Sequence, residues 1–223
     1  MAIENIEYEN LHCSLCRNTA SDRVAWILYP VSLSPEWVES ASAKYRTSIA
    51  VVTGIDWDNA LTPWAAPGVP KGSPAFKGEA EQFLIKLTQT LLPLIEAKLG
   101  CAETPERTLI GVSLSGLFTL WQWAESDCFH NIATLSGSFW YRDFVKWIWT
   151  QRFAGKTGRC FMLLGEAESH SKNPVFATVG KCTEDIAGYL RRHGIDVSYK
   201  IVKGNHYQYP IERLDMAMSA IYL

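Results

Sequence analysis

One serine in this chain stands where an apolar run gives way to a helical pattern. Ser113 follows the apolar run 108–112, and apolar residues recur at helical spacing after it, at Leu117, Leu120, Trp121 and Ala124. A strand, a tight turn and a helix within about eight residues is the layout of a nucleophile elbow, in which the positions two before and two after the nucleophile must be small. Gly111 and Ser115 meet that requirement, so Ser113 is the candidate nucleophile.

Ser115 is a rival for the same role. In its frame the flanking positions are Ser113 and Leu117, and leucine is too bulky for so tight a turn. The plainer alternative is that a strand meets a helix through glycine and serine, which favour turns in any protein. The remaining candidate residues therefore have to carry part of the argument.

A serine hydroxyl becomes a useful nucleophile when a base removes its proton, and histidine titrates in the right range. His206 follows the last predicted strand, which is where the base of an α/β-hydrolase stands, and the chain order of serine, acid and histidine is kept. His170 is a weaker alternative. The other histidines lie in or before predicted strands or near a helix end, at His12, His130 and His193.

The third member of such a triad orients the imidazole and stabilises its charged form. The segment Gly165-Glu166-Ala167-Glu168 follows the predicted strand 159–164. Glu168 lies deeper in the loop and is preferred over Glu166 as the acid. A dyad of Ser113 and His206, with both glutamates solvated, remains an alternative.

The oxyanion of an acyl-transfer intermediate needs fixed hydrogen-bond donors. The backbone N–H of Leu114, directly after the nucleophile, is one candidate. The second donor is expected in the loop after the predicted strand 24–29. Pro30 has no N–H, so Val31 or Tyr29 has to supply it.

Apolar periodicity predicts strands that alternate with helices along a single domain, residues 1–223. The strands are an edge strand or hairpin within 3–17, then 24–29, 48–53, 108–112, 131–135, 159–164 and 195–201; the helices are 37–45, 79–99 (kinked or split at Pro93), 139–153, 174–193 and 210–222. Such alternation indicates an α/β fold, a mainly parallel sheet with helices on both faces. Because ligands bind beyond the carboxyl ends of parallel strands, Ser113, Glu168 and His206 are expected to meet along one edge.

Residues 55–78 show little periodicity and contain several prolines and glycines. So long an irregular segment is usually a functional loop, here a candidate lid or substrate loop. Aromatic residues from this loop and from the segment after strand 131–135 are expected to form the substrate pocket. They are Trp57, Trp64, Phe139, Trp140 and Tyr141.

Composition excludes several classes of protein. The net charge of −2 argues against nucleic-acid binding, and no run reaches 18 apolar residues, so no membrane span is predicted. The N-terminus lacks the pattern of a signal peptide, so we expect a cytoplasmic protein with free thiols. Cys13 and Cys16 have C-x-x-C spacing without a second pair, and we interpret them as strand thiols rather than a metal or redox site.

Several segments together resemble the putative esterase branch of the α/β-hydrolases, which includes enterochelin esterase-like and esterase D-like enzymes. The resemblance covers about residues 24 to 222 and rests on Leu61-Thr62-Pro63-Trp64, Phe76 to Ala80, Leu92 to Glu96, Ile110 to Phe118, Leu135 to Tyr141, Gly165 to Glu168 and Gly204-Asn205-His206. It implies a serine hydrolase without metal or cofactor that cleaves an ester or thioester through an acyl-enzyme on Ser113. Two departures from the family pattern concern the site itself. Ser115 replaces the usual glycine of the elbow, and Tyr29-Pro30-Val31 replaces an acidic-glycine turn near the oxyanion donors.

The leading hypothesis is thus a cytoplasmic serine carboxylesterase for a small-molecule ester, with a homodimer as a candidate assembly. A non-catalytic binding or scaffold protein on the same fold is the alternative, because the altered elbow and oxyanion loop could mark lost activity. Acyl transfer to an acceptor other than water is a third hypothesis.

Overall fold

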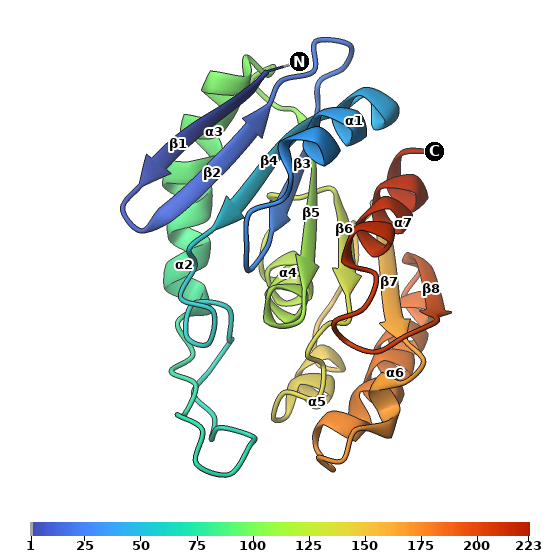
Figure 1. Cartoon of the computed structure of the whole chain (residues 1–223). Helices are drawn as coiled ribbons and strands as arrows, with labels where there is room; N and C mark the ends of the chain where they lie inside the picture. The colour runs from blue at the N-terminus through green and yellow to red at the C-terminus, as the bar shows by residue number, and fades with distance from the viewer. Residues whose placement is uncertain (1) are drawn as a thin grey trace.

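Eight strands form one mixed sheet in the computed structural model, which describes residues 2–223 (Figure 1). The sheet order is β1-β2-β4-β3-β5-β6-β7-β8. The strands are β1 (Ile3–Tyr8), β2 (Leu11–Cys16), β3 (Arg23–Leu28), β4 (Ser48–Thr53), β5 (Glu106–Val112), β6 (Asn131–Leu135), β7 (Arg159–Gly165) and β8 (Asp196–Val202). From β4 to β8 every neighbouring pair is parallel, as the alternation of strands and helices predicts.

The N-terminal strands form an antiparallel hairpin, and β2 of that hairpin pairs antiparallel with β4. Cys13 and Cys16 lie in β2 and are both buried. Three positions apart in a strand, they face opposite sides of the sheet and belong to different hydrophobic clusters. The two thiols therefore do not converge on a common ligand, and burial raises the pKa of Cys13 to about 11.

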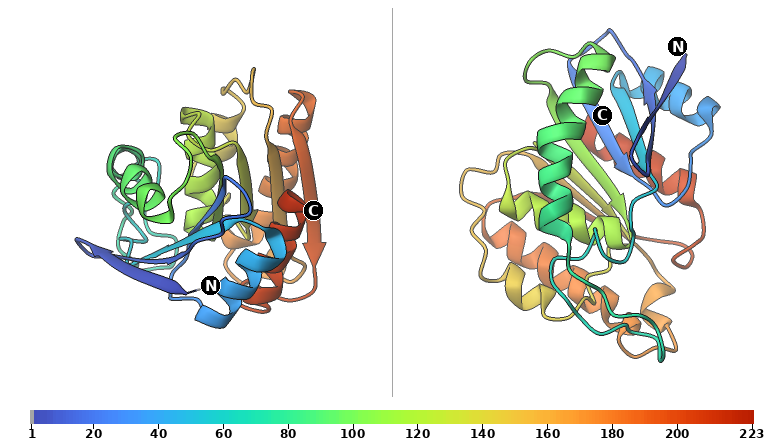
Figure 2. Two further views of the ribbon diagram at one scale, coloured as in Figure 1. Left: turned by 90° about the horizontal axis from the view of Figure 1, so that it is seen from above. Right: turned by 90° about the vertical axis from the view of Figure 1, so that its left-hand side faces the viewer.

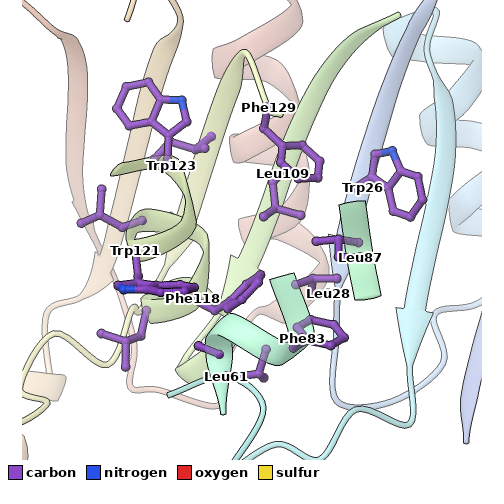
Figure 3. Packing of buried hydrophobic residues seen from close by; sticks show 14 of the residues in the cluster. Trp26, Leu28, Leu61, Phe83, Leu87, Leu109, Phe118, Trp121, Trp123 and Phe129 are labelled. Atoms are coloured by element: carbon purple, nitrogen blue, oxygen red, sulfur yellow. The ribbon is translucent and has the colours of Figure 1, made fainter. Parts of the chain in front are cut away.

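Helices cover both faces of the sheet and enclose a separate hydrophobic core on each face (Figure 2). On one face lie α1 (Pro35–Tyr45) and α7 (Pro210–Tyr222), which contact each other. The other face carries α2 (Ala80–Lys86), α3 (Leu92–Leu99), α4 (Leu114–Glu125), α5 (Phe144–Ile148) and α6 (Val179–Arg192). The core beneath this second group is rich in aromatic side chains, among them Trp26, Phe83, Phe118 and Trp123 (Figure 3). No helix among residues 2–223 is long and apolar enough to cross a membrane.

The predicted helix 79–99 is continuous but changes its winding before Pro93. A π-helical turn, Leu87–Leu91, separates α2 from α3, and the N–H of Leu92 donates to Leu87 O. The wider turn shifts the buried stripe of the helix by one position, so Leu92 is buried and Leu94 is 37 % exposed. A proline has no N–H and clashes with the carbonyl four residues before it, and a π turn relieves that clash without breaking the helix.

The predicted helix 139–153 is wrong over most of its length, because only α5 (Phe144–Ile148) is helical there. Asp143 has φ 61°, a left-handed conformation that prevents the helix from extending toward the N-terminus. Phe139 and Tyr141, 1 % and 2 % exposed, are held in the core by irregular chain instead. Phe139 and Tyr141 therefore stabilise a turn and not a helix.

Residues 55–78 contain no regular element apart from one isolated bridge between Ala66 and Phe76. Leu61 and Thr62 are fully buried, and Ala80 N–H donates to Thr62 O, so the base of this loop is packed against the domain. The tip, 70–75, is exposed.

Candidate active site

Ser113 sits at the junction of β5 and α4 in a strained backbone conformation, φ 56° and ψ −120°. A non-glycine residue adopts such angles only where the surrounding structure enforces them, and these places are often functional. A Cβ built on Gly111 would lie 2.2 Å from Ser115 O, so glycine is required two positions before the serine. The local chain therefore has the geometry that the elbow pattern predicts.

Ser115, the rival serine, is completely buried. Its Oγ accepts a hydrogen bond from Val112 N–H (2.7 Å) and lies 2.8 Å from Leu28 O and 2.9 Å from Val112 O, either of which can accept its proton. We call this set of contacts the Ser115 clamp. It ties the elbow to the end of β3, so the serine that replaces the family's glycine has a structural place rather than an exposed nucleophilic one.

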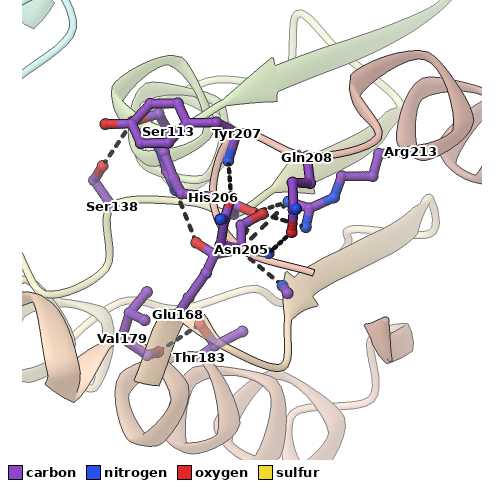
Figure 4. Close-up of polar contacts among 12 residues, drawn as sticks. Ser113, Ser138, Glu168, Val179, Thr183, Asn205, His206, Tyr207, Gln208 and Arg213 are labelled. Atoms are coloured by element: carbon purple, nitrogen blue, oxygen red, sulfur yellow. Dashed lines mark hydrogen bonds and ion pairs between the residues drawn. The ribbon is translucent and has the colours of Figure 1, made fainter. Parts of the chain in front are cut away.

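His206 and Glu168 are brought together from loops that are 38 residues apart in sequence. His206 Nδ1 lies 2.7 Å from Glu168 Oε2 (Figure 4). The second glutamate, Glu166, is exposed, and its backbone N–H donates a hydrogen bond to Val202 O. Of the two acids left open by the sequence, Glu168 is the one that contacts the histidine.

Four donors surround the Glu168 carboxylate, whose side chain is 5 % exposed. While Oε2 faces His206, Oε1 accepts from Ser136 Oγ (2.6 Å) and Gly165 N–H (2.7 Å) and lies 3.4 Å from Arg213 Nη1. Burial acts to raise the pKa of this carboxyl, but the hydrogen bonds from His206 and Ser136 outweigh burial and hold the pKa below its ordinary value of 4.5. Glu168 is therefore a fixed anion at neutral pH.

Two side chains of this network, Ser136 and Arg213, are not among the residues predicted from the sequence, and Arg213 is the charged one. It lies in the first turns of α7, is 4 % exposed, and also donates to Ser136 Oγ (2.8 Å) and Asn205 O (2.7 Å). A signal for it exists in the sequence. The buried face of α7 consists of Arg213, Leu214, Ala217, Met218 and Ile221, so an arginine occupies an apolar stripe, where a charged residue needs a buried partner.

The nucleophile candidate itself has a hydroxyl neighbour. Ser113 Oγ lies 3.3 Å from Ser138 Oγ, and Ser138 N–H donates to Ser113 O (3.0 Å). His206 lines both of the cavities that Ser113 lines, and its ring lies between Glu168 and the elbow (Figure 4). Among the described residues, the side-chain hydrogen-bond partner of Ser113 Oγ is Ser138, while His206 lies in the walls of the same two cavities.

The candidate oxyanion donors are backbone N–H groups. Leu114 is the first residue of α4, so its N–H has no partner within the helix. Tyr29 N–H donates to Val52 O (3.0 Å) in an extension of the β3–β4 pairing, which removes Tyr29 from the two candidates for a second donor. Val31 is 62 % exposed and lines a cavity together with Ser113.

Two cavities open on either side of Ser113 and His206. The first, of about 400 Å³, has Trp140, Phe176 and Val179 in its wall and is called the Trp140 cavity. The second, of about 420 Å³, has Trp57, Pro30 and Val31 in its wall and is called the Trp57 cavity. Volumes of this size suit small organic ligands.

Two of the predicted pocket aromatics, Trp57 and Trp140, therefore lie where the sequence indicates, and the other three do not. Trp64 donates its Nε1 hydrogen to Arg142 O (3.0 Å) and packs 6.0 Å from the Tyr141 ring. Tyr141 donates its hydroxyl to Trp64 O, and Phe139 stacks on Phe144 with ring centroids 5.7 Å apart. Trp64 and Tyr141 thus fix the loop 55–78 against the segment before α5, and Phe139 packs on α5; none of the three lines either cavity beside Ser113.

A family model matches most of the chain. The model described as putative esterase matches residues 34–193. The chain belongs to the putative esterase family. This membership confirms the resemblance seen in the sequence and assigns the chain to the carboxylesterase-type hydrolases. A curated relative, the uncharacterized protein YbbA of Bacillus subtilis, is 28 % identical over 197 residues, which are 84 % of this chain and 79 % of YbbA.

Solved structures confirm the α/β-hydrolase fold. An IroE-like serine hydrolase from Shewanella oneidensis superposes with a TM-score of 0.80 at 15 % identity, covering 99 % of this chain and 79 % of that one. The siderophore hydrolase EstB from Aspergillus nidulans gives 0.74 at 16 % identity, with 99 % and 94 % covered. The enterobactin esterase FES from Shigella flexneri gives 0.76 at 15 % identity, with 100 % and 59 % covered.

Proposed function

We propose that this esterase cleaves a carboxylic ester or thioester through an acyl-enzyme on Ser113. His206 acts as the general base and acid, and Glu168 orients and stabilises the imidazole. Leu114 and Val31 N–H groups bind the oxyanion. The observation that carries the proposal is the 2.7 Å contact of His206 with the buried Glu168 carboxylate, beside a serine in a strained elbow.

In the first half of the reaction, His206 Nε2 takes the Ser113 hydroxyl proton as Oγ attacks the carbonyl carbon. The carbonyl oxygen becomes an oxyanion, and the imidazolium stands against Glu168. When the intermediate collapses, the bond to the leaving alcohol or thiol breaks and the imidazolium returns its proton to that group. The acyl group remains on Ser113.

In the second half, water takes the place of the alcohol. His206 removes a proton from the water as its oxygen attacks the acyl carbon, and the same proton then returns to Ser113 Oγ when the acid leaves. Each bond formed is matched by one broken, and no metal or redox cofactor takes part. A fixed Glu168 anion supports both halves, because the imidazolium forms in each.

The test compares the wild type with Ser113→Ala on p-nitrophenyl acetate and butyrate, with intact mass measured after fluorophosphonate treatment. We expect turnover and a single adduct in the wild type, and a loss of kcat of about 10⁴-fold or more together with loss of the adduct in the variant. Ser115→Ala is the matched control, because it removes the neighbouring hydroxyl and leaves Ser113 in place.

A folded wild type with neither turnover nor adduct would contradict the proposal and favour the non-catalytic scaffold. Acyl transfer has its own signature, in which an added alcohol or thiol diverts product from the free acid to a new ester. The cytoplasmic location and the homodimer expected from the sequence remain predictions.

A further inference from the structure

The two cavities share Ser113, His206 and Tyr207, so they meet at the proposed point of attack. The carbonyl carbon of an ester carries an acyl arm and an alcohol arm, which extend in different directions once Ser113 has attacked. One arm can therefore enter the Trp140 cavity and the other the Trp57 cavity. Tyr207, which lines both cavities, is 85 % exposed, and its ring lies edge-on to that of His206 with the ring centroids 5.1 Å apart.

Apolar surface predominates in both cavities, and the polar part of the Trp140 cavity comes mainly from uncharged groups, the serine hydroxyls and Asn205. In the Trp140 cavity the rings of Trp140 and Phe176 lie 4.7 Å apart, and Val179 and Ala167 complete that side. In the Trp57 cavity the corresponding apolar surface comes from Trp57, Pro30, Leu135 and Pro210. Hydrophobic arms gain free energy from burial against such surfaces.

The charged side chains in these walls, His206 aside, are already neutralised. Glu168 lines the Trp140 cavity and Arg213 lines the Trp57 cavity, but the two form an ion pair with each other across the shared wall. Arg213 is 4 % exposed and Glu168 is 9 % exposed, so neither offers surface to a bound group. Among the described residues, no lysine lines either cavity.

An anionic arm that is buried in either cavity would thus lose hydration without gaining a counter-ion, which is unfavourable. A cationic arm would also find no counter-ion there, and its compensation would be limited to contact with the aromatic ring faces. Attack by the serine involves the carbonyl group alone and does not restrict the charge of the substrate arms. Any restriction on their charge therefore comes from the cavity walls.

We propose that the substrate is an ester whose acyl and alcohol arms are both uncharged and apolar, one arm in each cavity. This inference rests on the serine esterase function proposed above.

The test uses pairs of esters that have the same shape and differ in charge. For the acyl arm, p-nitrophenyl 4-methylpentanoate is compared with mono-p-nitrophenyl succinate; for the alcohol arm, 3,3-dimethylbutyl butyrate is compared with butyrylcholine. Each enzymatic kcat/KM is divided by the rate of hydroxide-catalysed hydrolysis of the same ester. We expect the neutral member of the acyl pair to be favoured about 100-fold and that of the alcohol pair by less, because aromatic walls offset part of the lost hydration of a quaternary ammonium.

Two lysine variants test whether the cavity walls cause the preference for neutral esters. Phe176→Lys and Trp57→Lys each place a cation in one cavity, and both positions are partly exposed, so a lysine can reach water. Phe176→Gln and Trp57→Gln are the neutral controls. We expect one of the lysine variants to raise the ratio of succinate to 4-methylpentanoate hydrolysis at least 10-fold over its glutamine control, which also identifies the acyl cavity.

The outcomes separate this inference from the proposed function. Equal normalised rates for the neutral and charged members in the wild type would overturn the inference, as would a ratio that neither lysine variant changes. If p-nitrophenyl acetate is not hydrolysed and fluorophosphonate does not react, the serine esterase function fails instead. Circular dichroism and thermal unfolding of all four variants show that rate changes come from folded protein.

Discussion

The two sides of Ser113 are built in different ways. On the side of His206, buried side chains hold one another: Glu168 accepts four contacts, and Arg213 stands behind it. On the side of Val31, the groups proposed to bind the oxyanion are the backbone N–H groups of Val31, which follows β3, and of Leu114, which begins α4; Val31 itself is 62 % exposed. The acid–base side thus depends on residue identity, whereas the oxyanion side depends on the path of the backbone.

This difference predicts how each side tolerates mutation. Side-chain substitutions should be severe on the acid–base side. On the oxyanion side they should be mild, unless they remove a backbone N–H or move the strand end.

Among the substitutions that test this contrast, Glu168→Gln should have the largest effect. It keeps the shape of the side chain but removes the anion that faces the imidazolium, so we expect kcat on p-nitrophenyl acetate to fall about 10³–10⁴-fold. Glu166→Gln, on the exposed neighbour, is the control and should retain wild-type kcat. Near-normal kcat in Glu168→Gln would instead establish a dyad of Ser113 and His206.

On the oxyanion side, Val31→Pro should be costly and Val31→Ala should not. Proline removes the backbone N–H, and loss of one oxyanion donor lowers kcat about 10²–10³-fold. Alanine keeps that N–H and changes only an exposed side chain. Steady-state kcat of the two variants decides the point, and equal values would place the second donor elsewhere.

Stability should also depend on pH through Glu168. The pKa of its carboxyl is lowered in the folded state, so its ionised form stabilises the fold above the ordinary value of 4.5, and this contribution is lost as pH falls through the lowered value. Glu168→Gln removes the buried anion beside Arg213, which keeps its hydrogen bonds to Ser136 and Asn205, and should cost about 3 kcal/mol at pH 7. Urea unfolding from pH 7 to pH 3 should show the wild type and the variant converging, whereas parallel curves would contradict the ion-pair account.

The smallest effect is expected from the Ser115 clamp. Ser115→Ala removes its hydrogen bonds to β3 and to Val112 and should destabilise the fold by about 1–3 kcal/mol, with kcat changed less than about 10-fold. Ser115→Gly restores the residue usual in the family and should lose slightly more stability, because glycine gains entropy in the unfolded chain. Thermal unfolding of both variants is the measurement, and an unchanged Tm in Ser115→Ala would show that the clamp has no energetic role.

The contrast between side-chain and backbone groups around Ser113 also explains which parts of the site could be predicted from the sequence. Ligand sites form beyond the carboxyl ends of parallel strands, which lie at one edge of the sheet whatever the order of the strands in the chain. This rule predicts that Ser113, Glu168 and His206 lie together, and all three line the Trp140 cavity. The choice between Tyr29 and Val31 could not be made in advance, since it depends on whether Tyr29 N–H continues the pairing with β4.

Contacts between distant segments were the main source of error. Trp64 and Tyr141 belong to the same aromatic cluster, but composition does not tell a ring in a cavity wall from a ring in the core. Arg213 contacts Glu168 across 45 residues of sequence, and nothing local in α7 names its partner. The fold class, by contrast, follows from repeated local patterns, and the family match and the solved structures confirm it.

The π turn before Pro93 has a consequence for the evolution of the chain length. Such a turn is equivalent to one residue inserted into a regular helix, so removal of one residue from 87–91 would leave the buried faces of α2 and α3 in phase. Pro93 opposes that deletion, because in the regular helix its ring would meet a carbonyl of the preceding turn. A deletion at this point should therefore survive only together with replacement of Pro93, so homologues that lack the extra residue should also lack the proline.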